Sequence, residues 1–505
     1  MTTRDVIDRW RGKKIHVIGP AGTEGSTVIE FLLAGGLTTI TAHEFRRRED
    51  FEAEFTRTHQ WLAPDARAGA AQRLLAAPIT FRWAERYLEG IERAEVIVVP
   101  QAWFRHRANA PLRALRDRGI PFSSMTQLFF EVSPSPIIGV TGTNGKFTVA
   151  YLIHQMLRSS GLRAHFSGND RSHIPMLYYV ADLTAQDWLV LELSNRQLID
   201  LPYSPHLAVI TNLAPHHLDD HGTFEKYVEV KRGIIRYQRA DDMAVLNADN
   251  PHTAAMASAC PHPYLFSRHG EQQAGAYVRD EAMVIRTSRL EQTIPLRALS
   301  APSAHGVENA LAACLAASLA GASSAAMVEV LAEFRGLPYR FRIVAESAGI
   351  QYIEDSLATN PAAAAAAIAS MDRPFVLIAG GARAGATAED FMPMREALLP
   401  SPVKAVVLIG ATTPQLQRAL TGLTVVAAGT LDRAVTEAHR LARAGEAVLL
   451  SPGCESFDQF ADYRARGDRF ADLVRALAAD STQTSPASPT GPVDVSERSS
   501  RRGRT

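Results

Sequence analysis

The sequence contains few cysteines, no net charge and no long apolar run, and each of these absences excludes a class of protein. Three cysteines in 505 residues, at positions 260, 314 and 454, are too few and too scattered for a disulfide framework or a zinc set, which favours a reducing compartment. Lysine plus arginine and aspartate plus glutamate both number 53, so the bulk charge gives no reason to expect a nucleic-acid or membrane partner. No run approaches the roughly 20 apolar residues of a membrane span, and Met1–Trp10 lacks the apolar core of a signal peptide. We therefore expect a soluble, cytoplasmic protein.

The length, and the alternation of buried-type strands with helical patterns, predict an α/β protein of three domains. Ser133–Pro136 is a stiff, polar break, and Gly336–Pro338 marks a second one. The end of the chain is rich in Ser, Thr and Pro with late arginines, a composition typical of disorder. The predicted domains are residues 1–132, 133–336 and 337–478, followed by a disordered tail of residues 479–505. Short alternating segments between Tyr264 and Leu296 predict a β-rich appendage.

The most informative stretch is Pro136–Val149, an apolar run that breaks into a glycine-rich turn and resumes as a helical pattern. Gly142 and Gly145 allow successive backbone N–H groups to face phosphate oxygens, and Lys146 adds a positive charge at the start of the helix. The spacing departs from the general phosphate loop, and Phe147 stands where a hydroxyl ligand of Mg²⁺ is expected. We interpret the stretch as a nucleotide site, with an ordinary βα turn as the alternative.

Polar groups follow two further strands predicted in the same domain. Glu192 lies near the end of the apolar run Trp188–Leu193, where open α/β sheets place ligands and where a carboxylate can hold Mg²⁺. The connection after Leu207–Asn212 carries a group of polar side chains: His216, His217, Asp219, Asp220 and His221. Their spacing matches no zinc signature, so a loop beside a magnesium nucleotide is favoured over a transition-metal centre. Lys231 follows on a helix and could reach the same edge, although an exposed lysine is the usual outcome.

The N-terminal segment offers a second glycine-rich turn after the strand Lys14–Gly19. Its glycines at 19, 22 and 25 do not match the G-x-G-x-x-G spacing, so a cradle for a nucleotide diphosphate and an ordinary βα turn are both open.

Several motifs together resemble the Mur ligases, over residues 12 to about 478. The phosphate-loop motif GTNGK is shared with the whole superfamily, including folylpolyglutamate synthases. Glu192–Leu198 resembles ELSSFQL and Leu450–Phe460 resembles LSPACASxDQF, and both are closest to the members that add D-glutamate to UDP-N-acetylmuramoyl-L-alanine. Arg466–Phe470 follows the second motif, as the corresponding residues do in the family.

The resemblance implies a Rossmann-like N-terminal domain, a P-loop ATPase-like central domain and a Rossmann-like C-terminal domain. It implies an ATP- and Mg²⁺-dependent amide ligation in peptidoglycan precursor synthesis, in which a substrate carboxylate is phosphorylated and an amine then displaces the phosphate. UDP-N-acetylmuramoyl-L-alanine and D-glutamate are the implied substrates of a monomer that closes its C-terminal domain on the central one. Two alternatives are a divergent ligase for another amino acid and a nucleotide-binding paralogue that has lost ligation.

The same resemblance implies the following residue roles, all of them expectations. The ATP contacts are Gly142, Thr143, Asn144, Gly145, Lys146, Phe147, Thr148, Asn309, Arg340 and Asp355. The metal ligands are Thr148, Glu192, His217 and Lys231, of which Lys231 matches a lysine that the family carbamylates. The catalytic residues are Lys146, His217 and Lys231. The contacts to the UDP substrate are Gly19, Thr23, His43 and Asn169. The contacts to the amino acid are Thr359, Arg383, Ser456, Phe457 and Tyr463.

This sequence also departs from the family pattern at the phosphate site. Thr148 follows Phe147 directly, an arrangement that resembles folylpolyglutamate synthases, and we expect its hydroxyl to take the place of the one that Phe147 removes. His216 replaces an acid and Asp220 replaces an arginine, which changes the charge of the polar loop.

Further departures concern the two substrates. Leu357 stands where many relatives carry lysine, and Ala384 replaces a lysine that grips the amino acid, a role Arg383 could take. In the N-terminal domain, His43-Glu44 stands where the family often has an acid that binds uracil, and Pro100–Trp103 replaces a Ser-Pro-Gly turn.

Overall fold

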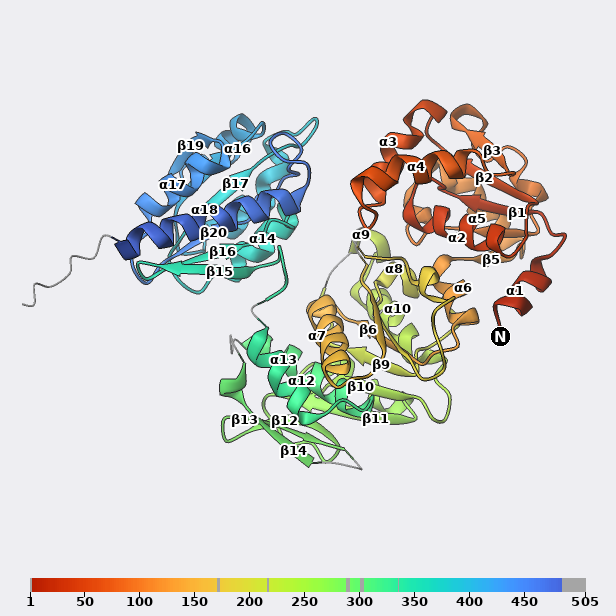
Figure 1. Ribbon diagram of the computed structural model, residues 1–505, viewed down its shortest axis with the longest axis horizontal. Helices are drawn as coiled ribbons and strands as arrows, with labels where there is room; N and C mark the ends of the chain where they lie inside the picture. Colours follow the sequence, from red (N-terminus) through yellow and green to blue (C-terminus); the bar gives the residue numbers. More distant parts are fainter. Residues whose placement is uncertain are drawn as a thin grey trace, which may run out of the picture. The chain divides into compact units, whose positions relative to one another are not determined.

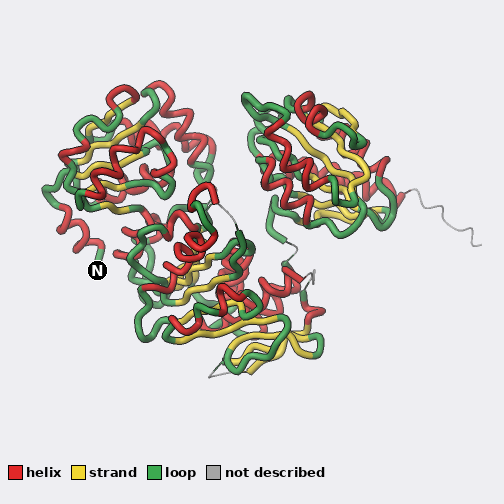
Figure 2. The backbone as a smooth tube through the Cα atoms, turned by 180° about the vertical axis from the view of Figure 1, so that it is seen from behind, coloured by secondary structure: helices red, strands yellow, loops and turns green. Residues whose placement is uncertain are grey.

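The computed structural model describes residues 2–169, 173–215, 218–287, 291–299, 304–334 and 336–483. It contains three sheets, each mostly parallel and accompanied by helices (Figures 1 and 2), which confirms the predicted α/β class. The chain divides into two compact units, residues 1–334 and 335–505, and the first unit holds two of the three sheets. The domain boundaries given above remain predictions.

The N-terminal sheet is wholly parallel in the order β3-β2-β1-β4-β5. Its strands are β1 (Ile15–Ile18), β2 (Ile40–Glu44), β3 (Thr80–Trp83), β4 (Val96–Val98) and β5 (Phe122–Ser123). Its helices are α1 (Thr3–Trp10), α2 (Thr23–Ala34), α3 (Phe51–Thr58), α4 (Pro64–Leu75), α5 (Ala110–Asp117) and α6 (Met125–Val132). The order reverses between β1 and β4, and in open α/β sheets the carboxyl ends of strands at such a point bind ligands. The glycine-rich turn after β1 lies at this place.

The central sheet has nine strands in the order β14-β13-β12-β11-β10-β9-β6-β8-β7. Its strands are β6 (Ile137–Thr141), β7 (Ala164–Ser167), β8 (Trp188–Glu192), β9 (Leu207–Ile210), β10 (Met243–Asn247), β11 (His262–Ser267), β12 (Gly275–Arg279), β13 (Ala282–Arg286) and β14 (Glu291–Pro295). Its helices are α7 (Lys146–Ser159), α8 (Asn195–Leu198), α9 (Leu218–His221), α10 (Phe224–Arg236), α11 (Pro251–Ala254), α12 (Ala304–Leu319) and α13 (Ser324–Glu333). The predicted β-rich appendage is a continuation of this sheet, because β11 pairs with β10 and β12 to β14 follow it in order.

Apolar packing fixes the two elements that flank the phosphate loop, strand β6 and helix α7. The residues of β6 are all buried, and α7 and the alanine-rich α12 pack beside each other against the same core. Small side chains on α12 permit this close approach. The start of α7 is therefore fixed at the carboxyl end of a central strand.

The second unit has a six-stranded sheet in the order β15-β16-β20-β17-β18-β19, parallel except for the β15–β16 pair. Its strands are β15 (Arg342–Ser347), β16 (Ile350–Glu354), β17 (Phe375–Gly380), β18 (Val403–Ile409), β19 (Val425–Gly429) and β20 (Ala447–Leu450). Its helices are α14 (Pro361–Ala369), α15 (Met392–Leu398), α16 (Thr413–Ala419), α17 (Leu431–Leu441) and α18 (Tyr463–Gln483). Helix α18 includes the first residues of the predicted tail, and the rest of that tail lies outside the described residues. Among the helices described, none is both long enough and apolar enough to cross a bilayer.

Candidate active site

The phosphate loop lies between β6 and α7, and two of its glycines have neighbours that leave no room for a side chain. A Cβ on Gly142, which has φ +148°, would lie 2.0 Å from Oγ1 of Thr211. A Cβ on Gly145, which has φ +78°, would lie 2.2 Å from Oδ1 of Asn309. The predicted ATP contact Asn309 therefore lies directly beside the loop, and both glycines are required by its geometry.

Hydrogen bonds hold the loop against the end of β9. The hydroxyl of Thr211 donates to the carbonyl of Asn144 at 2.5 Å, and the Asn144 N–H donates to the side-chain oxygen of Asn212 at 2.9 Å. Thr143 Oγ1 lies 3.1 Å from the hydroxyl of Tyr227. Lys146 Nζ donates to the carbonyl of Thr143 at 2.9 Å, so its charge lies over the loop at the positive end of α7.

Phe147 and Thr148 occupy different surroundings on the first turn of α7. The Phe147 ring packs among aromatic side chains, with centroids 5.3 Å from Phe166 and 5.1 Å from His173. Thr148 is half-buried on the same turn. A phenyl ring in an aromatic cluster is used for packing, which leaves Thr148 as the hydroxyl closest in sequence to Lys146.

Lys231 is the most unusual titratable group of the site. Its side chain is 1% exposed, and Nζ donates to Oγ1 of Thr141 at 2.8 Å. Burial, reinforced by the charge of Lys146 and opposed by Glu192, holds the pKa of Lys231 well below its usual range. The environment at the end of β6 therefore favours the neutral form of this amine more than water does.

Glu192 lies at the end of β8, whose residues pair with β6 so that Glu192 is opposite Val140. Its carboxylate accepts a hydrogen bond of 3.0 Å from the backbone N–H of Asn169. Lys146, Glu192 and Lys231 thus lie near one another at the carboxyl ends of the central strands β6 and β8, whereas the sequence left open whether Lys231 would be exposed on its helix. His216 and His217 lie outside the described residues, and within the described part no group of three His, Cys, Asp or Glu side chains is arranged to hold a metal.

Asp220, the departure from the family's arginine, is almost fully buried between two guanidinium groups. Its oxygens lie 3.1 Å from Nε of Arg105, which belongs to the N-terminal segment, and 2.7 Å from a terminal nitrogen of Arg196. The change of charge at this position is therefore matched by cations on both sides.

The glycine-rich turn of the N-terminal sheet contains two of the predicted UDP contacts. Gly19 has φ +72°, and its N–H donates to the carbonyl of His43 at 2.9 Å. Thr23 starts α2 and donates from Oγ1 to the carbonyl of Thr58 at 2.7 Å. The predicted contact Asn169 is exposed after β7 in the central sheet.

His43 and Glu44 differ in what they face. The buried His43 ring stacks on His16, and their nitrogens lie 2.8 Å apart. Glu44 reaches the glycine-rich turn, where its carboxylate accepts from the N–H of Ala21 at 3.2 Å and pairs with Arg46 at 3.1 Å. The sequence named Glu44 only beside His43 and did not name Arg46, and the structure brings both to the glycine-rich turn.

In the second unit, the predicted nucleotide contact Asp355 follows β16. It accepts from the Ser451 hydroxyl at 2.7 Å and from the Phe341 N–H at 3.1 Å. Burial raises the pKa of Asp355 to about 6, and both hydrogen bonds oppose that shift. Arg340 is exposed between Tyr339 and Phe341, which both have positive φ, so the backbone here is a tight turn.

The predicted amino-acid contacts lie on the loops that follow β16, β17 and β20 and at the start of α18. They are Thr359, Arg383, Ser456, Phe457 and Tyr463. Ala382 and Glu455 exchange two backbone hydrogen bonds of 2.7 and 2.9 Å, which join the loop of Arg383 to that of Ser456. Phe457 is 52% exposed and Ser456 is buried.

The buried guanidinium of Arg466 holds these loops by hydrogen bonds. In the sequence, Arg466 stood out only as the first residue of the motif Arg466–Phe470. Arg466 donates to the hydroxyl and the carbonyl of Ser356 at 2.8 and 2.9 Å, and to the carbonyl of Cys454 at 3.0 Å. It therefore ties the loop of Asp355 to the loop of Ser456.

Comparison with known proteins identifies the family. Residues 140–317 match the Mur ligase middle domain, and residues 339–454 match the Mur ligase glutamate ligase domain. The UDP-N-acetylmuramoylalanine–D-glutamate ligase of Symbiobacterium thermophilum is 37% identical over 402 residues, which cover 78% of this chain and 87% of that protein. The chain belongs to the Mur ligase family.

Other relatives extend the similarity over almost the whole Mur ligase. Enzymes of the same name from Acetivibrio thermocellus and Bacillus subtilis are 33% and 34% identical, covering 94% and 73% of this chain and 99% and 81% of theirs. The solved UDP-N-acetylmuramate–alanine ligase of Thermotoga maritima has the same fold, with a TM-score of 0.50, 18% identity, and coverage of 92% of this chain and 100% of that one. This Mur ligase is an enzyme of the ADP-forming acid–amino-acid ligase class.

Proposed function

We propose that this Mur ligase joins D-glutamate to UDP-N-acetylmuramoyl-L-alanine with hydrolysis of ATP to ADP. The observation that carries the proposal is the 37% identity to a D-glutamate ligase over 87% of that protein. The motifs on β6, on β8 and after β20 supply the parts that such a reaction needs, in the order of the relatives.

The reaction has two steps that balance. A carboxylate oxygen of the acceptor attacks the γ-phosphorus of ATP, the bond to ADP breaks, and an acyl phosphate forms. The amine of D-glutamate then attacks the acyl carbon, the carbon–oxygen bond to phosphate breaks, and the amine loses a proton. Such steps depend on positioning and on stabilisation of charge at the phosphates.

The phosphate loop is the proposed ATP site. The loop of Gly142, Thr143, Asn144 and Gly145 and the ammonium of Lys146 lie at the N-terminus of α7, where an anion is favoured. The N–H groups of Thr143 and Asn144 already donate to Asn212, so Lys146 and the first turn of α7 are the proposed phosphate donors. Asn309, beside Gly145, supplies a further polar contact. Arg340 and Asp355 are the proposed nucleotide contacts from the second unit.

Magnesium is implied by the family, and its ligands are oxygen atoms. Glu192 and Thr148 supply such atoms near the loop, and His217 is the sequence's candidate for a third ligand. An amine is a poor partner for Mg²⁺, but the neutral form of Lys231, which burial favours, can add CO₂ and lose a proton to give a carbamate with two oxygens. In that form the donor set would fit Mg²⁺, and the bound ion would spread charge over the γ-phosphate.

The two substrates have separate sets of proposed contacts, those of the acceptor in the first unit and those of D-glutamate in the second. Gly19, Thr23 and Asn169 are the proposed contacts of the UDP acceptor, with Glu44 at the turn and His43 behind it. The proposed contacts of D-glutamate are Thr359, Arg383, Ser456, Phe457 and Tyr463.

The proposal is tested by release of ADP from the purified chain. We expect release only when UDP-N-acetylmuramoyl-L-alanine, D-glutamate, ATP and Mg²⁺ are all present. Equal release with L-glutamate or with another amino acid would contradict the assignment of D-glutamate. Binding of ATP without release under any substrate combination would contradict ligation itself.

A further inference from the structure

Gln101 connects the N-terminal sheet to the edge of the central sheet that carries Glu192. Its side-chain nitrogen donates to Oδ1 of Asn169 at 3.1 Å, and its side-chain oxygen accepts from the Ser194 hydroxyl at 2.7 Å. Asn169 follows β7 and Ser194 follows β8, so one amide group bridges the ends of two neighbouring central strands.

Both partners of that amide lead directly to Glu192. The backbone N–H of Asn169 donates to the Glu192 carboxylate at 3.0 Å. Ser194 is two residues beyond Glu192 and caps α8 through a reciprocal pair of hydrogen bonds with Gln197. The carboxylate is therefore held between two segments that Gln101 fixes from outside the central sheet.

The backbone of Gln101 is anchored at the other end. Its N–H donates to a carboxylate oxygen of Glu24 at 2.7 Å, and Glu24 lies in the first turn of α2, next to Thr23. A three-bond path thus runs from the glycine-rich turn through Gln101 and Asn169 to Glu192.

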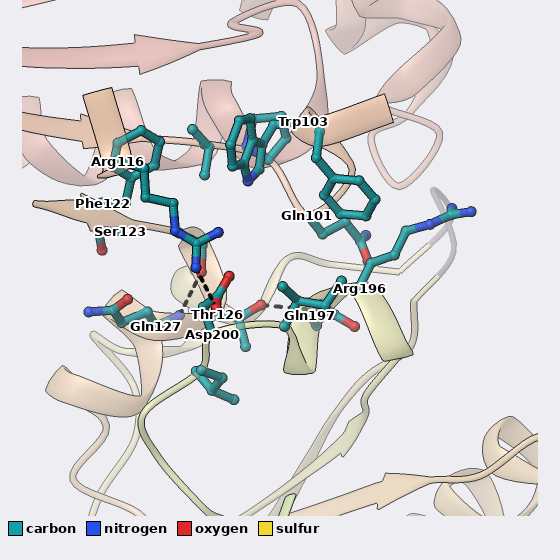
Figure 3. Close-up of a pocket in the computed structure, with 16 residues that line it drawn as sticks. Gln101, Trp103, Arg116, Phe122, Ser123, Thr126, Gln127, Arg196, Gln197 and Asp200 are labelled. Atoms are coloured by element: carbon teal, nitrogen blue, oxygen red, sulfur yellow. Dashed lines mark hydrogen bonds and ion pairs between the residues drawn. The ribbon is translucent and has the colours of Figure 1, made fainter. Parts of the chain in front are cut away.

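The path lies beside a cleft that Gln101, Arg196 and Gln197 line (Figure 3). Other contacts cross the same boundary without reaching Glu192. Arg116 pairs with Asp200 at 2.5 Å, and Arg105 pairs with Asp220. These pairs remain when the Gln101 side chain is changed. The effect of Gln101 can therefore be measured without loss of the ion pairs between the N-terminal and central segments.

From these contacts we propose that Gln101 is a positioning residue. It couples the glycine-rich turn, where the UDP acceptor is proposed to bind, to the Glu192 carboxylate, the proposed ligand of the nucleotide's Mg²⁺. The inference rests on the proposed function. When the acceptor orders the turn around Thr23 and Glu24, Gln101 transmits that order to Asn169 and Glu192. The acceptor and the magnesium nucleotide then each strengthen the binding of the other.

The decisive variant is Gln101→Met, which keeps the length of the side chain and the backbone N–H but removes both side-chain hydrogen bonds. The matched control is Gln127→Met, because Gln127 lines the same cleft but bonds to Glu131 within its own helix α6. Calorimetry measures the dissociation constant of UDP-N-acetylmuramoyl-L-alanine with and without Mg²⁺ and a non-hydrolysable ATP analogue.

We expect the nucleotide to tighten acceptor binding in the wild type and in Gln127→Met, and to have roughly tenfold less effect in Gln101→Met, a size typical of residues that support a metal ligand. The concentration of Mg²⁺ that half-saturates ADP release should rise in Gln101→Met alone, with an unchanged melting temperature. Equal coupling in all three proteins, or a change that merely follows a lower melting temperature, would overturn the inference. Absence of ADP release from the wild type would instead count against the proposed function, because the binding experiment needs no turnover.

Discussion

The amine of Lys231 lies 2.8 Å from the hydroxyl of Thr141, inside the protein and at the end of the strand that leads into the phosphate loop. Replacing Lys231 with Met should reduce ADP release by roughly 100-fold or more if a carbamate on this amine holds Mg²⁺. Folding should be nearly unaffected, since Thr141 keeps its hydrogen bond of 2.7 Å to the Leu193 carbonyl. Incubation with ¹³CO₂ should give a carbamate signal by NMR in the wild type and none in the variant. A wild type that carries no such signal and is indifferent to removal of CO₂ would contradict the carbamate.

The hydroxyl of Thr148 is expected to ligate Mg²⁺, which in other phosphate loops is done by a hydroxyl at the position of Phe147. Thr148→Val should weaken Mg²⁺-dependent ADP release by roughly 10- to 100-fold, and Thr148→Ser should retain most of it. Titration of Mg²⁺ at saturating ATP measures this, with Phe147→Leu as the packing control. Wild-type behaviour of Thr148→Val would refute the assignment.

Asp220 between Arg105 and Arg196 should contribute to the stability of the first unit. Asp220→Asn leaves two partly buried guanidinium groups without their carboxylate, which should lower the free energy of unfolding by about 2–4 kcal/mol. The tryptophans at 10, 61, 83, 103 and 188 all lie in the first unit, so their fluorescence in urea reports on it. Asp8→Asn, which removes an exposed pair with Arg11, should cost less than about 1 kcal/mol. Equal losses in the free energy of unfolding for the two substitutions would contradict a larger contribution from the buried Asp220 cluster.

Buried histidines should make the N-terminal sheet sensitive to acid. Burial lowers the pKa of His16 to about 4 and that of His43 to about 3, from ordinary values of 6.5. The unfolded chain therefore binds protons first as the pH falls below 6.5, so this stability is present above that pH and is lost between 6.5 and about 4 for His16 and between 6.5 and about 3 for His43. Each histidine contributes a slope of up to about 1.4 kcal/mol per pH unit. The double variant His16→Leu/His43→Leu should flatten the pH dependence of the urea midpoint, and an unchanged slope would contradict this explanation.

Much of the fold follows from local sequence patterns. Apolar runs correctly predicted β8, β17 and β20 because each strand is buried on both faces. The β-rich segment after Tyr264 was recognised as strands, but its continuation of the central sheet depends on pairing with β10, which no local pattern specifies. The site was predictable where one motif carries it, as around Gly145 and Lys146.

The remaining features depend on tertiary contacts. Lys231 could have been an exposed helical lysine, and only its position behind Thr141 makes it buried. His43 and Glu44 are neighbours in a strand whose side chains alternate between faces, so a shift of one residue decides which of them reaches the glycine-rich turn. The partners of Gln101 and Asp220 lie far away in the chain, and nothing near them in sequence indicates these bonds.

The central claim is that this chain activates a carboxylate through an acyl phosphate, and oxygen transfer tests it most directly. UDP-N-acetylmuramoyl-L-alanine labelled with ¹⁸O in its terminal carboxylate is incubated with the chain, ATP, Mg²⁺ and D-glutamate, and the released phosphate is analysed by mass spectrometry. The account predicts one ¹⁸O atom in each phosphate, with formation of the D-glutamyl product in equal amount. Unlabelled phosphate, or phosphate released without that product, would contradict it.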